Sequence, residues 1–149
     1  MGGKVLLASI FMLTIFQKSY SQSPDRQFTL DYINKSLGKE IQTEIKGSQL
    51  VVTFYNNQGE KIREDRAPLA YLDLKVFFEE GSTLLCIPCL KNEEDCVTRT
   101  LVVQKIKRPY DRISISVQDK VQFQKLKKAF EHLIRLTSEI GYKDAVTFE

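Results

Sequence analysis

The feature that most constrains the fold is a run of apolar residues at helical spacing over residues 119–139. The members of this apolar stripe are Phe123, Leu126, Ala129, Phe130, Leu133 and Ile134, and Thr137 and Ile140 continue the spacing. The i, i+3, i+4, i+7 pattern predicts an amphipathic helix with one broad apolar face. Asp119 and Gln122 form a capping-box pattern at its start, and Gly141 suits its end. Such a helix is not stable alone, so we expect it to cover an apolar sheet.

The strand-rich middle of the chain supplies that surface. Residues 41–45 alternate between apolar and polar side chains, and Gly47 separates them from a β-rich run at residues 50–55, which predicts a hairpin. We expect further strands at residues 76–78, 83–90, 96–106 and 113–117, with residues 83–90 and 96–106 paired as a hairpin. The polar residues 61–66 are interpreted as an edge strand or loop, and Pro109 as a break.

The N-terminal part of the domain is expected to add one short helix over residues 28–38, capped by Thr29 and ended by Gly38, after an irregular lead at residues 23–27. Strands do not alternate with helices, which argues against a parallel sheet. The sequence therefore predicts an α+β fold. A bent antiparallel sheet or partly open barrel of six or seven strands is capped by the long C-terminal amphipathic helix.

The first 21 residues have the pattern of a signal peptide. Lys4 precedes an uninterrupted apolar run over residues 5–16, and the small residues Ser19 and Ser21 suit a cleavage site. A membrane anchor is the alternative, but a spanning helix needs about 20 apolar residues. We therefore expect cleavage after residue 21, a single domain at residues 22–149, and a periplasmic or extracellular location.

The charge of the expected mature domain is nearly balanced. The whole chain has a formal net charge of +3, and removal of residues 1–21 takes away Lys4 and Lys18 without any acidic residue. Nucleic-acid binding depends mainly on neutralising phosphates, so this balance gives no case for a nucleic-acid partner.

The three cysteines allow more than one interpretation. Cys86 and Cys89 form a C-x-P-C motif, which a thiol-disulfide oxidoreductase would use at a helix N-terminus; here the motif lies in a predicted strand. In the expected hairpin Cys89 faces Cys96 at a distance that suits a disulfide, and export favours oxidation. We predict a Cys89–Cys96 disulfide with Cys86 as a buried free thiol, and Cys86–Cys96 is the rival pairing.

Other candidate sites are weaker. A zinc site built from the three cysteines and His132 lacks a second ligand pair, and His132 falls on the polar flank of the predicted helix. The acidic pairs at residues 79–80 and 93–95 suit charged turns rather than a calcium loop. We therefore expect no catalytic residues, no metal and no cofactor.

A basic stretch surrounds Pro109 and consists of Lys105, Lys107, Arg108 and Arg112. Asp111 interrupts it, so a solvated face is the simpler interpretation. The alternative is a patch that binds an anionic ligand, such as an anionic lipid or the envelope surface.

Four motifs resemble the pleckstrin-homology-like fold and a group of small exported bacterial proteins of unknown function. They are Tyr32-Ile33-Asn34, Leu72-Asp73-Leu74, Cys89 with Cys96, and Ala129-Phe130-Glu131-His132-Leu133-Ile134. The resemblance covers most of residues 28–137 and implies a fold rather than an activity.

We hypothesise an exported, non-enzymatic domain that binds a protein, peptide or other ligand. The expected binding surface is an exposed strand edge or the groove beside the C-terminal helix. The alternatives are a binder of anionic lipid or envelope surface and a thiol-disulfide oxidoreductase that uses Cys86 and Cys89.

Overall fold

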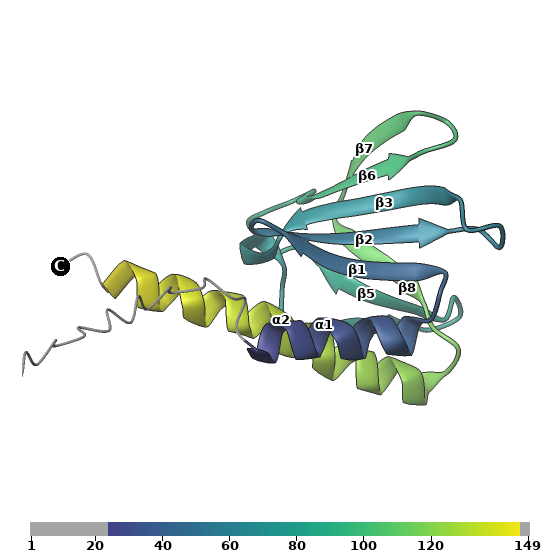
Figure 1. Ribbon diagram of the computed structural model, residues 1–149. Coiled ribbons are helices and arrows are strands. Elements are labelled where there is room, and N and C mark those ends of the chain that lie inside the picture. The colour runs from purple at the N-terminus through teal and green to yellow at the C-terminus, as the bar shows by residue number, and fades with distance from the viewer. Residues whose placement is uncertain (1–23, 147–149) are drawn as a thin grey trace, which may run out of the picture.

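The computed structural model describes the backbone of residues 24–146 and the side chains of residues 26–137, so the expected signal peptide lies outside the described residues. The described strands follow one helix and precede another along the chain, as Figure 1 shows. The elements in chain order are α1 (Pro24–Leu37), β1 (Ile41–Lys46), β2 (Gln49–Tyr55), β3 (Lys61–Pro68), the 3-10 turn η1 (Leu69–Tyr71), β4 (Phe77–Glu79), β5 (Leu84–Pro88), β6 (Val97–Leu101), β7 (Ile106–Tyr110), β8 (Arg112–Ser116) and α2 (Lys120–Val146).

The described strands form two antiparallel sheets, so the predicted α+β class is confirmed. One sheet has five strands in the order β1-β2-β3-β6-β7, and the other has three in the order β4-β5-β8. Residues 24–146 thus contain eight strands where six or seven were expected.

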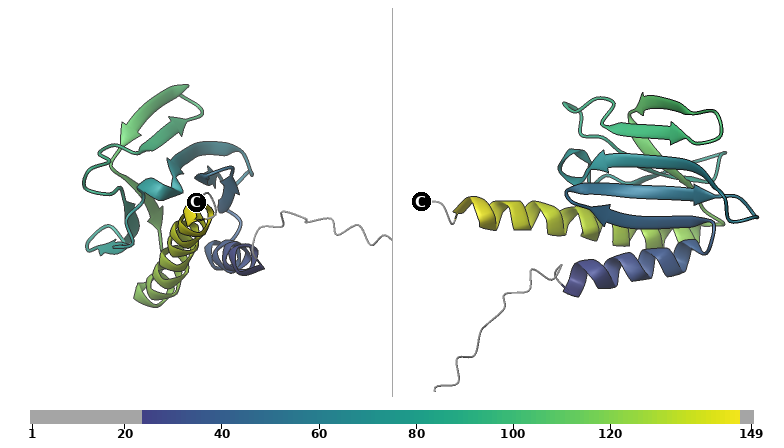
Figure 2. Two further views of the ribbon diagram at one scale, coloured as in Figure 1. Left: turned by 90° about the vertical axis from the view of Figure 1, so that its left-hand side faces the viewer. Right: turned by 45° about the horizontal axis from the view of Figure 1, so that its top comes forward.

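The two sheets meet at a corner where one long strand changes sheet. Only Asp111 separates β7 from β8; β6 pairs with β7 and β5 pairs with β8. The Cys89 backbone N–H donates to the Asp111 carbonyl at 2.8 Å and continues the ladder across the corner. β5 and β6 therefore follow one another along the same side of β7–β8, and the sheets form a strongly bent surface (Figure 2).

This arrangement corrects three predictions for the second half of the sheet. β5 and β6 do not pair as a hairpin, because each pairs with the returning strand instead. The expected strand at residues 96–106 is divided into β6 and β7 by a turn in which Lys105 has a φ of +52°. Pro109 does not break the strand, because it lies in β7 at the sheet edge, where its missing N–H is tolerated.

The prediction for residues 61–66 was also wrong. They belong to β3, the central strand of the five-stranded sheet, and Asp65 is completely buried. A polar sequence can occupy this position because ion pairs satisfy its carboxylates, as described below. Alternation alone cannot distinguish such a strand from an exposed edge.

The helix α2 provides much of the core. Every residue of the predicted stripe from Phe123 to Ile134 is buried, which confirms the stripe. Asp119 Oδ1 accepts a hydrogen bond from the Gln122 backbone N–H at 2.8 Å, as a capping residue should. Gly141 does not end the helix, which continues to Val146. A glycine destabilises a helix by about 1 kcal/mol but does not prevent it.

The helix α1 lies antiparallel to α2 (Figure 2). Arg26 near its start contacts the Thr137 hydroxyl at 3.4 Å, and the Ser36 carbonyl near its end accepts from the Gln122 amide at 2.7 Å. The helix begins at Pro24, earlier than expected, because proline fits a first helical turn. Thr29 is therefore an interior helix residue rather than a cap, whereas Gly38, at a φ of +78°, follows the helix end as predicted.

Candidate functional site

The strand edges of the large sheet are poorly suited to binding an extended peptide. On β1, the Asn34 side chain of α1 donates to the Thr43 carbonyl at 2.8 Å and accepts from the Thr43 N–H at 2.7 Å. Asn34 thus takes the place of a neighbouring strand. On β7, Pro109 offers no N–H, and Lys107 adds charge at the edge. Both features discourage pairing with a further strand.

A concave surface lies instead between α1 and α2. A groove of about 490 Å³ is lined by Phe28, Thr29, Tyr32, Lys125, Lys128, Ala129 and His132. Two adjoining hollows share Lys125 and extend the groove to Val121 at the start of α2. We call the whole feature the α1–α2 groove. From Val121 to His132 it runs for about 16 Å, the length of three helical turns.

Helical spacing on both walls positions the lining residues. On α2, Val121, Lys125, Lys128 and His132 lie three or four residues apart and form a second stripe beside the buried one. On α1, Phe28 and Tyr32 are separated by one turn. The sequence analysis did not identify this stripe, since its apolar members are few.

The groove combines exposed apolar side chains with positive charge. Phe28 is 75% exposed, Val121 64% and Tyr32 40%. No ion pair joins Lys125 or Lys128 to another described residue. Asp119 is the carboxylate among the lining residues, and it is engaged in the α2 cap. The groove therefore suits a partly apolar, acidic ligand.

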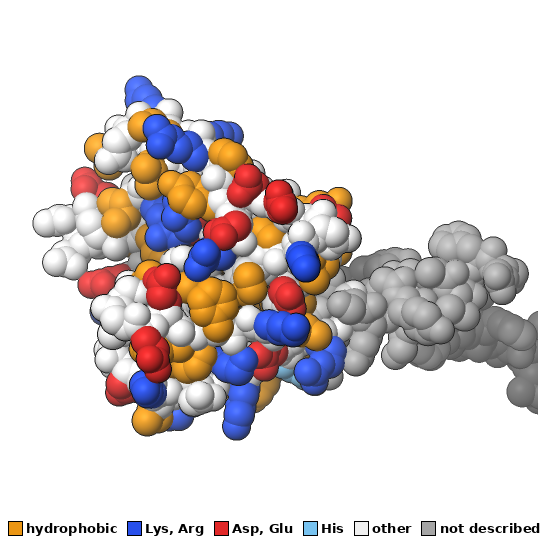
Figure 3. Space-filling model, turned by 180° about the vertical axis from the view of Figure 1, so that it is seen from behind, with side chains coloured by type: hydrophobic (Ala, Val, Ile, Leu, Met, Phe, Trp, Pro, Cys, Tyr) orange, Lys and Arg blue, Asp and Glu red, His pale blue; other side chains and the backbone are white. Residues whose placement is uncertain are grey.

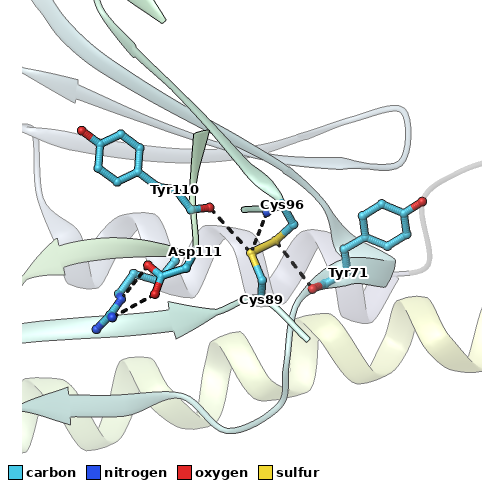
Figure 4. Close-up of a disulfide and its surroundings, with 6 residues drawn as sticks. Tyr71, Cys89, Cys96, Tyr110 and Asp111 are labelled. Atoms are coloured by element: carbon cyan, nitrogen blue, oxygen red, sulfur yellow. Dashed lines mark hydrogen bonds and ion pairs between the residues drawn. A yellow bond between two sulfur atoms is a disulfide. The ribbon is translucent and has the colours of Figure 1, made fainter. Parts of the chain in front are cut away.

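The structure contains the disulfide between Cys89 and Cys96, with a Cα–Cα distance of 5.8 Å. It closes the base of the loop at residues 90–95 where the chain passes from β5 to β6. Figure 4 shows it between the backbones of Tyr71 and Tyr110, whose carbonyl oxygens lie 3.6 and 3.9 Å from its sulfurs. The residue pair is the expected one, although the reason is not, because the cysteines do not face each other across a hairpin.

Cys86 is a free, buried thiol on β5. Burial raises its pKa, which disfavours the reactive thiolate. Because Cys89 is bonded to Cys96, the C-x-P-C motif has no dithiol pair in this state, and the zinc alternative lacks two of its thiolates. Among the described residues, no three His, Cys, Asp or Glu side chains gather as a metal site.

The four predicted basic residues are divided between two sheets. Lys105, Lys107 and Arg108 are exposed on the β6–β7 hairpin. Arg112 lies on β8, donates to both carboxylate oxygens of Asp111 at 2.9 and 3.0 Å, and stacks 5.6 Å from the Phe77 ring centre. The hydrogen bond from Arg112 holds the pKa of Asp111 below its usual value. Arg112 is thus neutralised, while the other three remain together.

A buried ionic cluster on the concave face of the large sheet was missed. Asp65 accepts two hydrogen bonds from Arg99, both at 2.8 Å, and two from Arg63. Arg63 stacks on Phe54, and Arg99 stacks on Tyr110. The only sequence signal is the spacing of Arg63 and Asp65, which puts both on one face of a strand. Both arginines share the one carboxylate, and Arg63 also donates to the Ser114 carbonyl at 3.0 Å, so the cluster links β3 to β6 and β8.

Comparisons of the chain with protein-family models, curated proteins and solved structures give no match. No helix within residues 24–146 is long and apolar enough to cross a membrane. The function is therefore inferred from the surfaces described above.

Proposed function

We propose that this chain is an exported, non-enzymatic binding module with a pleckstrin-homology-like arrangement. The bent antiparallel sheet with a C-terminal helix supports that arrangement, and α1 is an addition to it. The ligand is an acidic, amphipathic helical segment of a partner protein, and it occupies the α1–α2 groove. The observation that carries the proposal is the exposure of Phe28, Tyr32 and Val121 beside lysines without acidic partners.

A helical ligand fits the shape of the groove. Two antiparallel helices present a linear depression, and a third helix can lie in it with residues at i, i+4 and i+7 as anchors. The length of about three turns matches a segment of roughly 11 residues. An extended peptide would gain little here, because helix backbones offer no free hydrogen-bonding edge.

An acidic ligand fits the charge of the groove. Lys125 and Lys128 line the groove and are exposed, so each can pair with a carboxylate on the flank of a bound helix. Such pairs mainly increase the association rate and select the partner, while Phe28, Tyr32 and Val121 supply apolar contact. We therefore expect affinity to fall as the salt concentration rises.

The test uses a fluorescent 14-residue helical peptide with leucines at i, i+4 and i+7 and flanking glutamates. Fluorescence anisotropy measures its binding to the mature chain. We expect Lys125→Glu/Lys128→Glu to weaken binding at least tenfold, and Phe28→Ala to weaken it comparably. Lys105→Glu/Lys107→Glu carries the same charge change on the far hairpin and should have little effect beyond the general change in net charge.

A peptide with lysines in place of the glutamates serves as the ligand control. Equal binding of both peptides, or binding that survives the Lys125→Glu/Lys128→Glu and Phe28→Ala changes, would contradict the proposal. Cross-linking from a photoreactive residue at position 32 in intact cells then identifies the natural partner.

A further inference from the structure

The turn between β6 and β7 carries a second exposed apolar surface. The Lys105 N–H donates to the Val102 carbonyl at 3.3 Å and closes the turn, and the Val102 N–H donates to the Ile62 carbonyl at 3.0 Å. Val103 is 73% exposed, Ile62 38% and Val102 36%. We call these three residues the apolar tip. It projects from the side of the molecule opposite α1 and α2 (Figure 1).

The residue types at this apex are unusual for a hairpin. Turns favour glycine, asparagine, aspartate and proline, because these residues adopt the backbone angles or bond to the local backbone. Here two valines occupy the start of the turn, and Lys105 takes the left-handed conformation with a φ of +52°. The side chain of Val103 gains little from burial at this position, since it remains 73% exposed.

Positive charge surrounds the apolar tip. Lys105, Lys107 and Arg108 are exposed and form no ion pair with another described residue, whereas Lys61 pairs with Glu64. At the upper end of Figure 3, Lys and Arg side chains alternate with hydrophobic ones, and Asp and Glu lie lower on the face. The apolar tip is thus a small apolar surface that is flanked by the positive charges of Lys105, Lys107 and Arg108.

We propose that the apolar tip is an interfacial contact for an anionic lipid bilayer. Val102 and Val103 enter the boundary between headgroups and acyl chains, while Lys105, Lys107 and Arg108 approach lipid phosphates. The contact depends on the negative charge of the bilayer surface and on its ability to deform, and it does not require one particular lipid headgroup. It does not rest on the α1–α2 groove, which lies on the opposite side of the molecule.

A bilayer fits this surface better than a protein partner does. The tip is convex, and a stable protein interface buries about 1,200 Å² or more in total, which three aliphatic side chains on a protruding turn do not provide. A bilayer deforms around a protrusion, and its negative surface attracts the lysines over a Debye length. A weak, reversible attachment is the expected result.

Vesicle flotation tests the contact with the full mature chain. The vesicles contain phosphatidylglycerol and phosphatidylcholine at 3:7, and phosphatidylcholine vesicles serve as the control for charge. We expect binding to the anionic vesicles to fall at least tenfold in Val103→Glu. It should fall about 25-fold in Lys105→Gln/Lys107→Gln, because each lysine near such a surface contributes about fivefold. The groove variant Lys125→Gln/Lys128→Gln removes the same charge and should bind as the unchanged chain does.

A fluorescence reporter distinguishes insertion from electrostatic adsorption. The chain contains no tryptophan, so Val103→Trp introduces a single one. Its emission should shift to the blue on addition of the anionic vesicles, and brominated lipid should quench it. Val121→Trp, at an exposed site on α2, should show neither effect. The proposal is overturned if the chain does not float, if Val103→Glu floats undiminished, or if both tryptophans respond alike.

Discussion

At the scale of single residues, Asp65 is a buried carboxylate that forms ion pairs with Arg63 and Arg99. Its side chain is fully buried, yet it accepts hydrogen bonds from two arginines that themselves stack on aromatic rings. Burying a charge is unfavourable unless its partners replace the lost water. The cluster therefore contributes little net stability as a whole, but the loss of its centre would leave two arginines without their counter-ion.

Replacing Asp65 should lower the stability of the fold strongly. We expect Asp65→Asn to lower the free energy of unfolding by about 3 kcal/mol, because it leaves partly buried positive charge uncompensated. Urea denaturation under non-reducing conditions measures the change. Glu44→Gln is the matched control, since Glu44 pairs with Lys46 at the surface and should cost under about 1 kcal/mol. Equal effects of the two substitutions would disprove the assigned importance of burial.

Glu64, on the other face of β3, should make stability depend on pH. Burial acts to raise its pKa, but hydrogen bonds from Arg66 and Lys61 outweigh burial and hold the pKa below the ordinary value of 4.5. A carboxyl with a lowered folded pKa stabilises the fold above its unfolded pKa. That contribution disappears as the pH falls through the folded pKa.

The measurement is the difference in unfolding free energy between the unchanged chain and Glu64→Gln. We expect this difference to be full above about pH 5 and to shrink steadily as the pH approaches about 3. Urea titrations at several pH values provide it. A difference that stays constant across this range would show that Glu64 has no such coupling.

At the scale of elements, the sequence predicted those whose signal is local. The stripe from Phe123 to Ile134 and the β1–β2 hairpin each depend on neighbouring residues, and both agree with the structure. The sequence also predicted strands at residues 83–90 and 96–106, and β5 and β6 lie within these ranges. It does not reveal their partners, because pairing of β5 with β8 and of β3 with β6 depends on contacts distant in sequence.

The candidate groove was only partly predictable for a related reason. A position beside the C-terminal helix was among the expected binding surfaces, but its residues were not identified. Phe28 was interpreted only as the first residue of a helix. The relation between Phe28 and the lining residues of α2 appears only when α1 is packed antiparallel to α2, which no local pattern specifies.

The disulfide acts on the junction between elements, where β5 ends and β6 begins. Its two cysteines are seven positions apart. Closing so short a loop should stabilise the fold by about 2–3 kcal/mol. We therefore expect Cys89→Ala/Cys96→Ala to lower the unfolding free energy by that amount, as measured by denaturation.

Reductant provides the control for this prediction. It should destabilise the unchanged chain to the same extent and have no further effect on Cys89→Ala/Cys96→Ala. The Cys86→Ser variant should keep its sensitivity to reductant, because the pair that is reduced does not include Cys86. Insensitivity of the unchanged chain would contradict the assigned role of the bond.

At the scale of the whole molecule, the two proposed surfaces lie on opposite sides of the bent sheet (Figure 1). The α1–α2 groove belongs to the helical side, and the apolar tip belongs to the β6–β7 hairpin. If the tip rests on a bilayer, the groove faces away from it. Such a molecule can hold a helical segment of another protein near a membrane surface.

This arrangement predicts that the two activities are independent. Sites this far apart with no shared partners should have additive effects. We expect vesicle-bound protein to bind the acidic peptide with an affinity within about twofold of that of the free protein. Peptide anisotropy measured with and without anionic vesicles tests this. Competition between peptide and vesicles would show instead that both use one surface.

The covalent closure at Cys89 and Cys96 has a practical consequence for protein engineering. Residues 91–95 lie outside every strand, and the bond fixes the anchor points of the loop 5.8 Å apart whatever lies between them. Lengthening an already closed loop costs only about 0.6 kcal/mol per doubling. An epitope or a fluorescent tag grafted at these positions should leave the scaffold intact and provide a handle for imaging the protein in living cells.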